Sequence, residues 1–151
     1  MRYFIRCSLL IFMLPLLHWG CKKNTGRSSS LIAGSWELRQ TSAAMNPSLG
    51  QYGPGNGNIL EFTGNNYKIH KDGQVIKSGQ FTVLQDHTVQ ESVCLVFPKG
   101  EYVNRIVYDT SYSANKIFYQ VEGDKLTFYS GCYAYDAGHS EVYERVASAG
   151  D

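Results

Sequence analysis

Short runs in which apolar and polar residues alternate recur along most of the chain, and each run is followed by a turn. Residues 34–41 form the first run, with Trp36 and Leu38 at its apolar positions. Period-two alternation is typical of a β-strand with one buried face and one face in water. Further strands are predicted at residues 59–63, 67–71, 74–77, 79–84, 92–97, 102–108, 116–121, 125–129 and 141–146.

Turn signals separate these runs. Asp72-Gly73 and Gly123-Asp124 accept positive φ at little cost, so each predicts a hairpin. Residues 42–58 are rich in Pro and Gly, and we expect a long loop there without ladder pairing. No amphipathic helical stretch is evident. About eight to ten short strands joined by hairpins favour an all-β antiparallel barrel or sandwich over any α/β design.

The amino end has the composition of a signal peptide. Arg2 and Arg6 precede an apolar run over residues 7–17, and no acidic residue occurs there. The run is shorter than the roughly 20 residues that a transmembrane helix needs. It ends in Gly20-Cys21 and then turns polar, which resembles the lipobox of bacterial lipoproteins. The resemblance implies cleavage before Cys21 and attachment of a diacylglycerol to the Cys21 thiol.

These features predict three parts of the chain. Residues 1–20 are expected to be the lipoprotein signal peptide, residues 21–32 the lipidated Cys21 with a flexible tether, and residues 33–147 one folded domain. Several acyl chains on Cys21 would anchor the protein stably to a membrane of the cell envelope. Lys22-Lys23 lacks the aspartate that resembles an inner-membrane retention signal, which favours the outer membrane. Ordinary secretion with Cys21 as a plain thiol is the alternative.

Charge and aromatic content narrow the class of protein further. When Arg2 and Arg6 leave with the signal peptide, the 14 basic residues become 12, against 13 acidic ones. A balanced chain without a basic cluster argues against nucleic acid as a partner. The 11 tyrosines and 7 phenylalanines suit half-buried β-strands.

Two cysteines remain in the predicted folded domain, Cys94 and Cys132. Cysteine pairs in exported domains usually form disulfides, so a Cys94–Cys132 bridge is predicted. The alternative is that Cys94, which lies in the apolar run 93–97, is a small buried hydrophobe.

Several motifs occur in a characteristic order between about residues 33 and 146. They are Gly34-Ser35-Trp36, Leu60-Glu61-Phe62, Gly79-Gln80-Phe81, Gly123-Asp124-Lys125-Leu126 and Tyr143-Glu144-Arg145. This order resembles small bacterial lipocalin-like lipoproteins. The resemblance implies an antiparallel up-and-down β-barrel of about eight strands, in which Gly34 and Trp36 open the first strand. It also implies that Arg145 packs on Trp36 and joins the first and last strands; the alternative is an ordinary core tryptophan and an exposed arginine.

The sequence contains no recognisable catalytic set, phosphate-binding loop or dinucleotide fingerprint. His70, His87 and His139 are far apart in the chain. Asp86-His87 and Asp136-x-x-His139-x-Glu141 come nearest to a ligand set, but they lack the tight pairs typical of zinc sites. We therefore expect no enzymatic activity, no metal and no cofactor.

Two functions fit these observations. The first is a membrane-tethered module that binds a small hydrophobic ligand inside the barrel, with residues 42–58 as a lid over its mouth. The second is an envelope accessory protein with a side-chain-filled barrel, whose tyrosine-rich segment 129–135 contacts a protein or glycan partner. Inhibition of an envelope enzyme is a third alternative, which no residue pattern selects.

Overall fold

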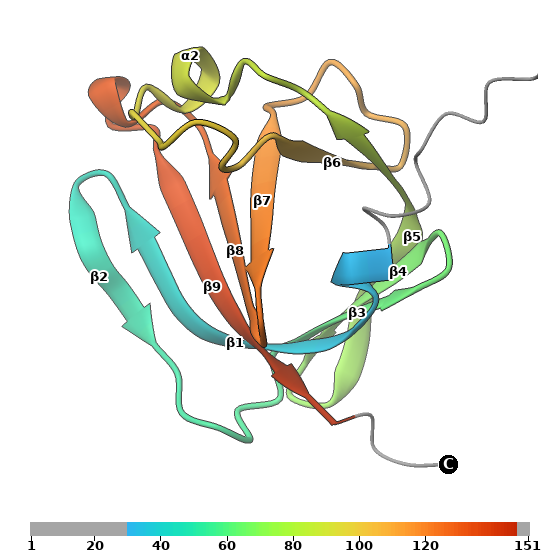
Figure 1. Ribbon diagram of the computed structural model, residues 1–151. Helices are drawn as coiled ribbons and strands as arrows, with labels where there is room; N and C mark the ends of the chain where they lie inside the picture. Colours follow the sequence, from blue (N-terminus) through green and yellow to red (C-terminus); the bar gives the residue numbers. More distant parts are fainter. Residues whose placement is uncertain (1–29, 148–151) are drawn as a thin grey trace, which may run out of the picture.

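The computed structural model describes residues 30–147, which form a closed antiparallel β-barrel (Figure 1). Nine strands occur in this part of the chain: β1 (Gly34–Ala43), β2 (Asn46–Gln51), β3 (Ile59–Thr63), β4 (Asn66–Lys71), β5 (Gln74–Gln85), β6 (Asn104–Tyr108), β7 (Ile117–Glu122), β8 (Lys125–Ser130) and β9 (His139–Val146). Eight of them close the ring in the order β1, then β3 to β9, and β9 pairs back with β1. The predicted up-and-down barrel is confirmed.

The extra strand, β2, corrects the sequence interpretation. Residues 46–51 were expected to lie in a long loop, but they pair with the second half of β1, while β3 pairs with its first half. β2 is the edge strand of the sheet. An edge strand tolerates Pro47 because a proline without an N–H disrupts a sheet only where that N–H is needed for the ladder.

β5 is one continuous strand of 12 residues, in which the runs predicted at residues 74–77 and 79–84 are joined. Its first part pairs with β4 and its second part with β6. Gly79 lies where these two pairings meet, and a Cβ atom there would collide with the side chains of Asp109 and Tyr67. The glycine therefore permits close packing at this point instead of a turn.

The strand predicted over residues 92–97 is wrong. Residues Val89–Val93 form a short helix, α2, whose end is marked by Cys94 with a left-handed φ of 59°. Val89 and Val93 lie one helical turn apart, and both are buried against Phe118 on the outer wall of the barrel. Leu95 and Phe97 of the apolar run pack against the same outer cluster, whereas Val96 is 90% exposed, so the run is held by side-chain packing and needs no ladder partners.

The main core fills one part of the barrel interior. Its buried members are Ile32, Trp36, Leu60, Phe62, Tyr67, Phe81, Val83, Ile106, Tyr119, Leu126 and Phe128. Ile32 is fully buried, so the packed domain begins before the predicted boundary at residue 33. The predicted signal peptide, Cys21 and residues 22–29 of the tether lie outside the described residues. Within residues 30–147, no helix has the length and apolar character required to cross a bilayer.

Candidate functional site

The first and last strands meet at Trp36 and Arg145, which are direct partners in the β1–β9 ladder. The guanidinium carbon of Arg145 lies 4.0 Å from the centroid of the Trp36 ring. Arg145 Nη1 also donates a hydrogen bond to the carbonyl of Ala33 at 2.8 Å, and Trp36 Nε1 donates to the carbonyl of Ile32 at 2.7 Å. These contacts hold the segment before β1 against this end of the barrel and match the packing that the family resemblance implies.

Glu37 fixes part of the predicted lid on the outside of the barrel. Its carboxylate accepts hydrogen bonds from Arg39 Nη1 at 2.6 Å and from the amides of Gly55 and Gly57 at 3.0 and 3.2 Å. Burial alone would raise the pKa of Glu37, but these hydrogen bonds hold it below its ordinary value. Because Glu37 points away from the Trp36 face, residues 55–57 lie on the outer wall. The lid role expected of residues 42–58 as a whole stays a prediction.

Strand β9 carries a row of inward side chains that continues the Trp36–Arg145 contact. Alternate residues of a strand share one face, so Tyr143, Glu141 and His139 lie on the face of Arg145. Tyr143 packs against the main core. Its hydroxyl donates a hydrogen bond to Glu141 Oε2 at 2.9 Å. A carboxylate is thereby placed on the inner wall, where Phe128 of β8 is its ladder partner.

Aromatic rings surround this carboxylate. The centroid of the Phe128 ring lies 5.8 Å from that of Tyr143 and 6.0 Å from that of Tyr119. Tyr67 and Tyr108 form a further edge-to-face pair with centroids 4.7 Å apart. Burial raises the pKa of both Tyr108 and Tyr143, and the charge of Glu141 raises it further. These rings and the carboxylate therefore share one environment inside the barrel.

The interior has two parts that differ in exposure. Trp36, Leu126 and Phe62 are at most 2% exposed and form a dry, filled part. Other inward side chains remain partly exposed, and we call them the inner cluster: Leu38, Tyr108, Ile117, Glu141 and Tyr143. The inner cluster is the candidate binding site.

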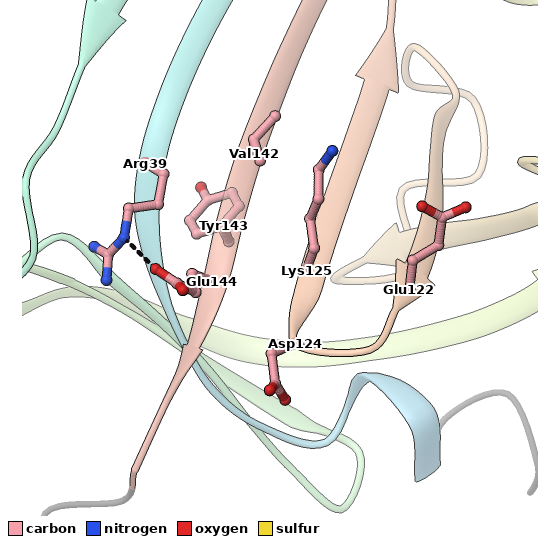
Figure 2. A pocket seen from close by; sticks show the side chains of 7 residues that line it. All are labelled: Arg39, Glu122, Asp124, Lys125, Val142, Tyr143 and Glu144. Carbon is pink, nitrogen blue, oxygen red and sulfur yellow. Dashed lines mark hydrogen bonds and ion pairs between the residues drawn. The ribbon is translucent and has the colours of Figure 1, made fainter.

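A pocket is found on the outer wall (Figure 2). It lies where β1, β8 and β9 meet, and charged side chains of both signs line it: Arg39, Glu122, Asp124, Lys125 and Glu144. Figure 2 shows the bond from Arg39 Nε to Glu144 Oε2, which is 2.8 Å long. Because Arg39 also pairs with Glu37, its charge is already compensated. This pocket is therefore less suited to an apolar ligand than the inner cluster.

Cys94 and Cys132 form a disulfide with their Cα atoms 5.0 Å apart. It joins the end of α2 to the segment that enters a short 3₁₀-helix, η1 (Tyr133–Tyr135). Tyr129 packs against Tyr102, with ring centroids 4.9 Å apart, and against Tyr133 at 6.1 Å. Much of the tyrosine-rich segment is thus part of an outer packing cluster, whereas Tyr135 is 83% exposed.

Two of the histidines that the structure describes lie close to an acidic side chain. His139 Nε2 lies 3.3 Å from Glu141 Oε1, and His70 Nε2 lies 3.2 Å from Glu61 Oε2. Within residues 30–147, no three His, Cys, Asp or Glu side chains converge in a way that could hold a metal ion.

The sequence interpretation missed Glu141 and Tyr143 as interior residues. Counting back from Arg145 in steps of two would have placed both on the Trp36 face. No family model, curated protein or solved structure matches this chain. The function is therefore argued from the barrel and its inner cluster.

Proposed function

We propose that this protein is a membrane-anchored, lipocalin-like lipoprotein that binds a small hydrophobic ligand in its barrel and catalyses no reaction. The observation that supports the ligand most strongly is the inner cluster, whose apolar and aromatic side chains face inward but are not fully covered. Barrels of about eight strands are either filled by side chains or hold one small ligand. Here the filled part would form the floor and the inner cluster the wall of the binding site.

Ligand binding is tested by titrating the full chain with a neutral lipophilic fluorophore, N-phenyl-1-naphthylamine, and measuring its fluorescence. Ile117 belongs to the inner cluster, so Ile117→Trp fills the proposed site with a larger side chain. Val96 is 90% exposed, two residues after the disulfide-bonded Cys94 and not part of the inner cluster, which makes Val96→Trp the matched control. We expect saturable fluorescence enhancement with the unmodified chain and Val96→Trp, and affinity weaker by about tenfold or more for Ile117→Trp.

Two results of this titration contradict the proposal. One is the absence of saturable binding to the unmodified chain. The other is equal affinity for the two tryptophan variants while circular dichroism shows both to be folded.

The anchor is proposed from the lipobox-like sequence that ends at Cys21. Cells given labelled palmitate should incorporate label into the unmodified protein and not into Cys21→Ala, because only the thiol accepts the diacylglycerol. The labelled protein should fractionate with the cell envelope, and with the outer membrane in particular. Equal labelling of both proteins, or of neither, would refute an anchor at Cys21.

The dry part of the barrel supports a second candidate function. Complete packing around Trp36 and Leu126 is what a solid scaffold requires. An accessory protein of this kind would use exposed side chains near the disulfide, such as Tyr135 and Val96, to contact an envelope protein or glycan. Retention of an immobilised partner by the unmodified chain, and its loss with Tyr135→Ala, would favour this role.

A further inference from the structure

We propose that the ligand carries a positive charge, and that the inner cluster receives an organic cation: an amine or quaternary ammonium group with an apolar part, held by Glu141 among aromatic rings. This inference rests on the proposed function, since it names the chemical class of the ligand for the same site. Three observations support it: the position of Glu141, the aromatic rings near it, and the lack of an ion pair between Glu141 and any lysine or arginine of the described residues.

Glu141 is held on the inner wall by its strand and by a neighbour. Its ladder partners are Phe128 on β8 and Thr41 on β1, so both flanking strands fix its direction. The Tyr143 hydroxyl donates to Oε2 at 2.9 Å, which orients the carboxylate. The side chain is still 34% exposed. A carboxylate that is fixed in place and remains accessible can bind a ligand without first being rearranged.

The rings beside Glu141 suit a cation. An ammonium group within about 6 Å of an aromatic centroid is attracted by the ring face, and aromatic cages are used to recognise quaternary ammonium ligands. Tyr143 is the partly exposed ring next to Glu141; it packs on buried Phe128 with centroids 5.8 Å apart, and Phe128 in turn lies 6.0 Å from buried Tyr119. Tyr108, which is also partly exposed, adds a ring that packs on Tyr67 with centroids 4.7 Å apart. An apolar ligand part would contact Leu38 and Ile117, the aliphatic members of the inner cluster.

The charges around the site point to the same class of ligand. No lysine or arginine among the described residues pairs with Glu141, and its one ion-pair contact there is His139 at 3.3 Å. Glu141 accepts one hydrogen bond from Tyr143 and remains 34% exposed, so its negative charge is still open to a further partner. A cationic ligand supplies that partner. An anionic ligand would be repelled, and the phosphate of a phospholipid head group would share this penalty, so we infer a soluble amphiphilic amine.

Three probes with the same alkyl chain test the inference on the unmodified full chain: hexyltrimethylammonium, hexylphosphocholine and hexanol. We expect hexyltrimethylammonium to bind most tightly in isothermal titration, by about tenfold over hexanol. Equal or tighter binding of hexylphosphocholine would show that the cation is recognised as part of a lipid head group. Equal affinity for hexanol and hexyltrimethylammonium would overturn the inference that the ligand is a cation. The proposal of a hydrophobic ligand would remain. Binding of no probe, together with a failed fluorophore titration, would overturn both.

A pair of neutralising variants assigns the charge. Glu141→Gln keeps the size of the side chain and should lose about tenfold in affinity for hexyltrimethylammonium while leaving hexanol unaffected. Glu91→Gln removes a carboxylate from the exposed side of α2, and it should change neither the affinity for hexyltrimethylammonium nor that for hexanol. Unchanged cation binding in Glu141→Gln would contradict the inference. The probe series on the unmodified chain needs no variant, so it decides the question even where Glu141→Gln fails to fold.

Discussion

Gly34 shows how one residue makes the closure of the barrel possible. Its φ is +115°, and a Cβ atom there would lie 2.7 Å from Arg145 Nη1. Any larger side chain would be strained in the backbone and would also occupy the path that the guanidinium takes to the Ala33 carbonyl. The glycine, the Trp36 ring and Arg145 therefore depend on one another, and the Gly-x-Trp motif has a physical reason beyond resemblance.

Gly34→Ala should destabilise the barrel by about 2 kcal/mol, because it combines an unfavourable φ with displacement of Arg145. Gly53→Ala is the matched control, since a Cβ atom at Gly53 meets nothing within 4 Å. We expect the control to change the free energy of unfolding by less than about 0.5 kcal/mol. Chemical denaturation of both variants measures the difference. Equal free energies of unfolding for Gly34→Ala and the unmodified chain would contradict a stabilising role of the Arg145 packing.

At the scale of elements, Asp86 connects segments that are not joined by backbone hydrogen bonds between strands. It follows β5 directly, and its carboxylate accepts hydrogen bonds from the backbone and hydroxyl of Thr88 at 3.0 and 2.6 Å, just before α2. Lys116 Nζ lies 2.9 Å and Arg105 Nη1 3.5 Å from Asp86 Oδ2. The acid thus joins α2 to β6 and to the residue that precedes β7. This explains how a five-residue helix keeps its place on the outer wall.

This network predicts a pH-dependent stability. Burial would raise the pKa of Asp86, but hydrogen bonds from Thr88 and Lys116 outweigh it and lower the pKa from 3.8 to about 2. A lowered folded-state pKa stabilises the fold above pH 3.8, and that contribution of about 2 kcal/mol is lost as the pH falls toward 2. Asp86→Asn should therefore be less stable than the unmodified chain at pH 6, and the gap should close near pH 2.

Denaturation curves across this pH range measure the gap. Asp72→Asn in the exposed β4–β5 turn is the control, because asparagine also accepts the positive φ of 51° found at Asp72. If the difference in free energy of unfolding between Asp86→Asn and the unmodified chain stays constant from pH 6 to pH 2, the ionisation of Asp86 does not contribute to stability.

For the whole molecule, period-two alternation predicted most of the antiparallel strands because they bury one face, and the resemblance added that they close into a barrel. The strand predicted at residues 59–63 is observed as Ile59–Thr63. The pairing of Trp36 with Arg145 also follows the resemblance, since these two residues are ladder partners. Local pattern and global fold agree wherever a strand has water on one side and the main core on the other.

The remaining features depend on contacts that local pattern does not contain. Val89 and Val93 define only one helical turn, which is too short to reveal a helical period, so the pattern does not predict α2. Pro47 indicated a loop because the sequence does not say that β2 is an edge strand. Glu141 was considered only as a metal ligand, because its inward direction follows from the register of β9 against β1.

The proposed ligand site is best located by an NMR titration of the full chain with the neutral fluorophore. Binding in the barrel predicts that the largest chemical-shift changes fall on Tyr108, Ile117 and Tyr143, and that they saturate together. Signals of Phe97 and Tyr129 in the outer packing cluster should stay in place. Saturable changes confined to that outer cluster, or no change in the inner cluster at saturating fluorophore, would contradict a ligand inside the barrel.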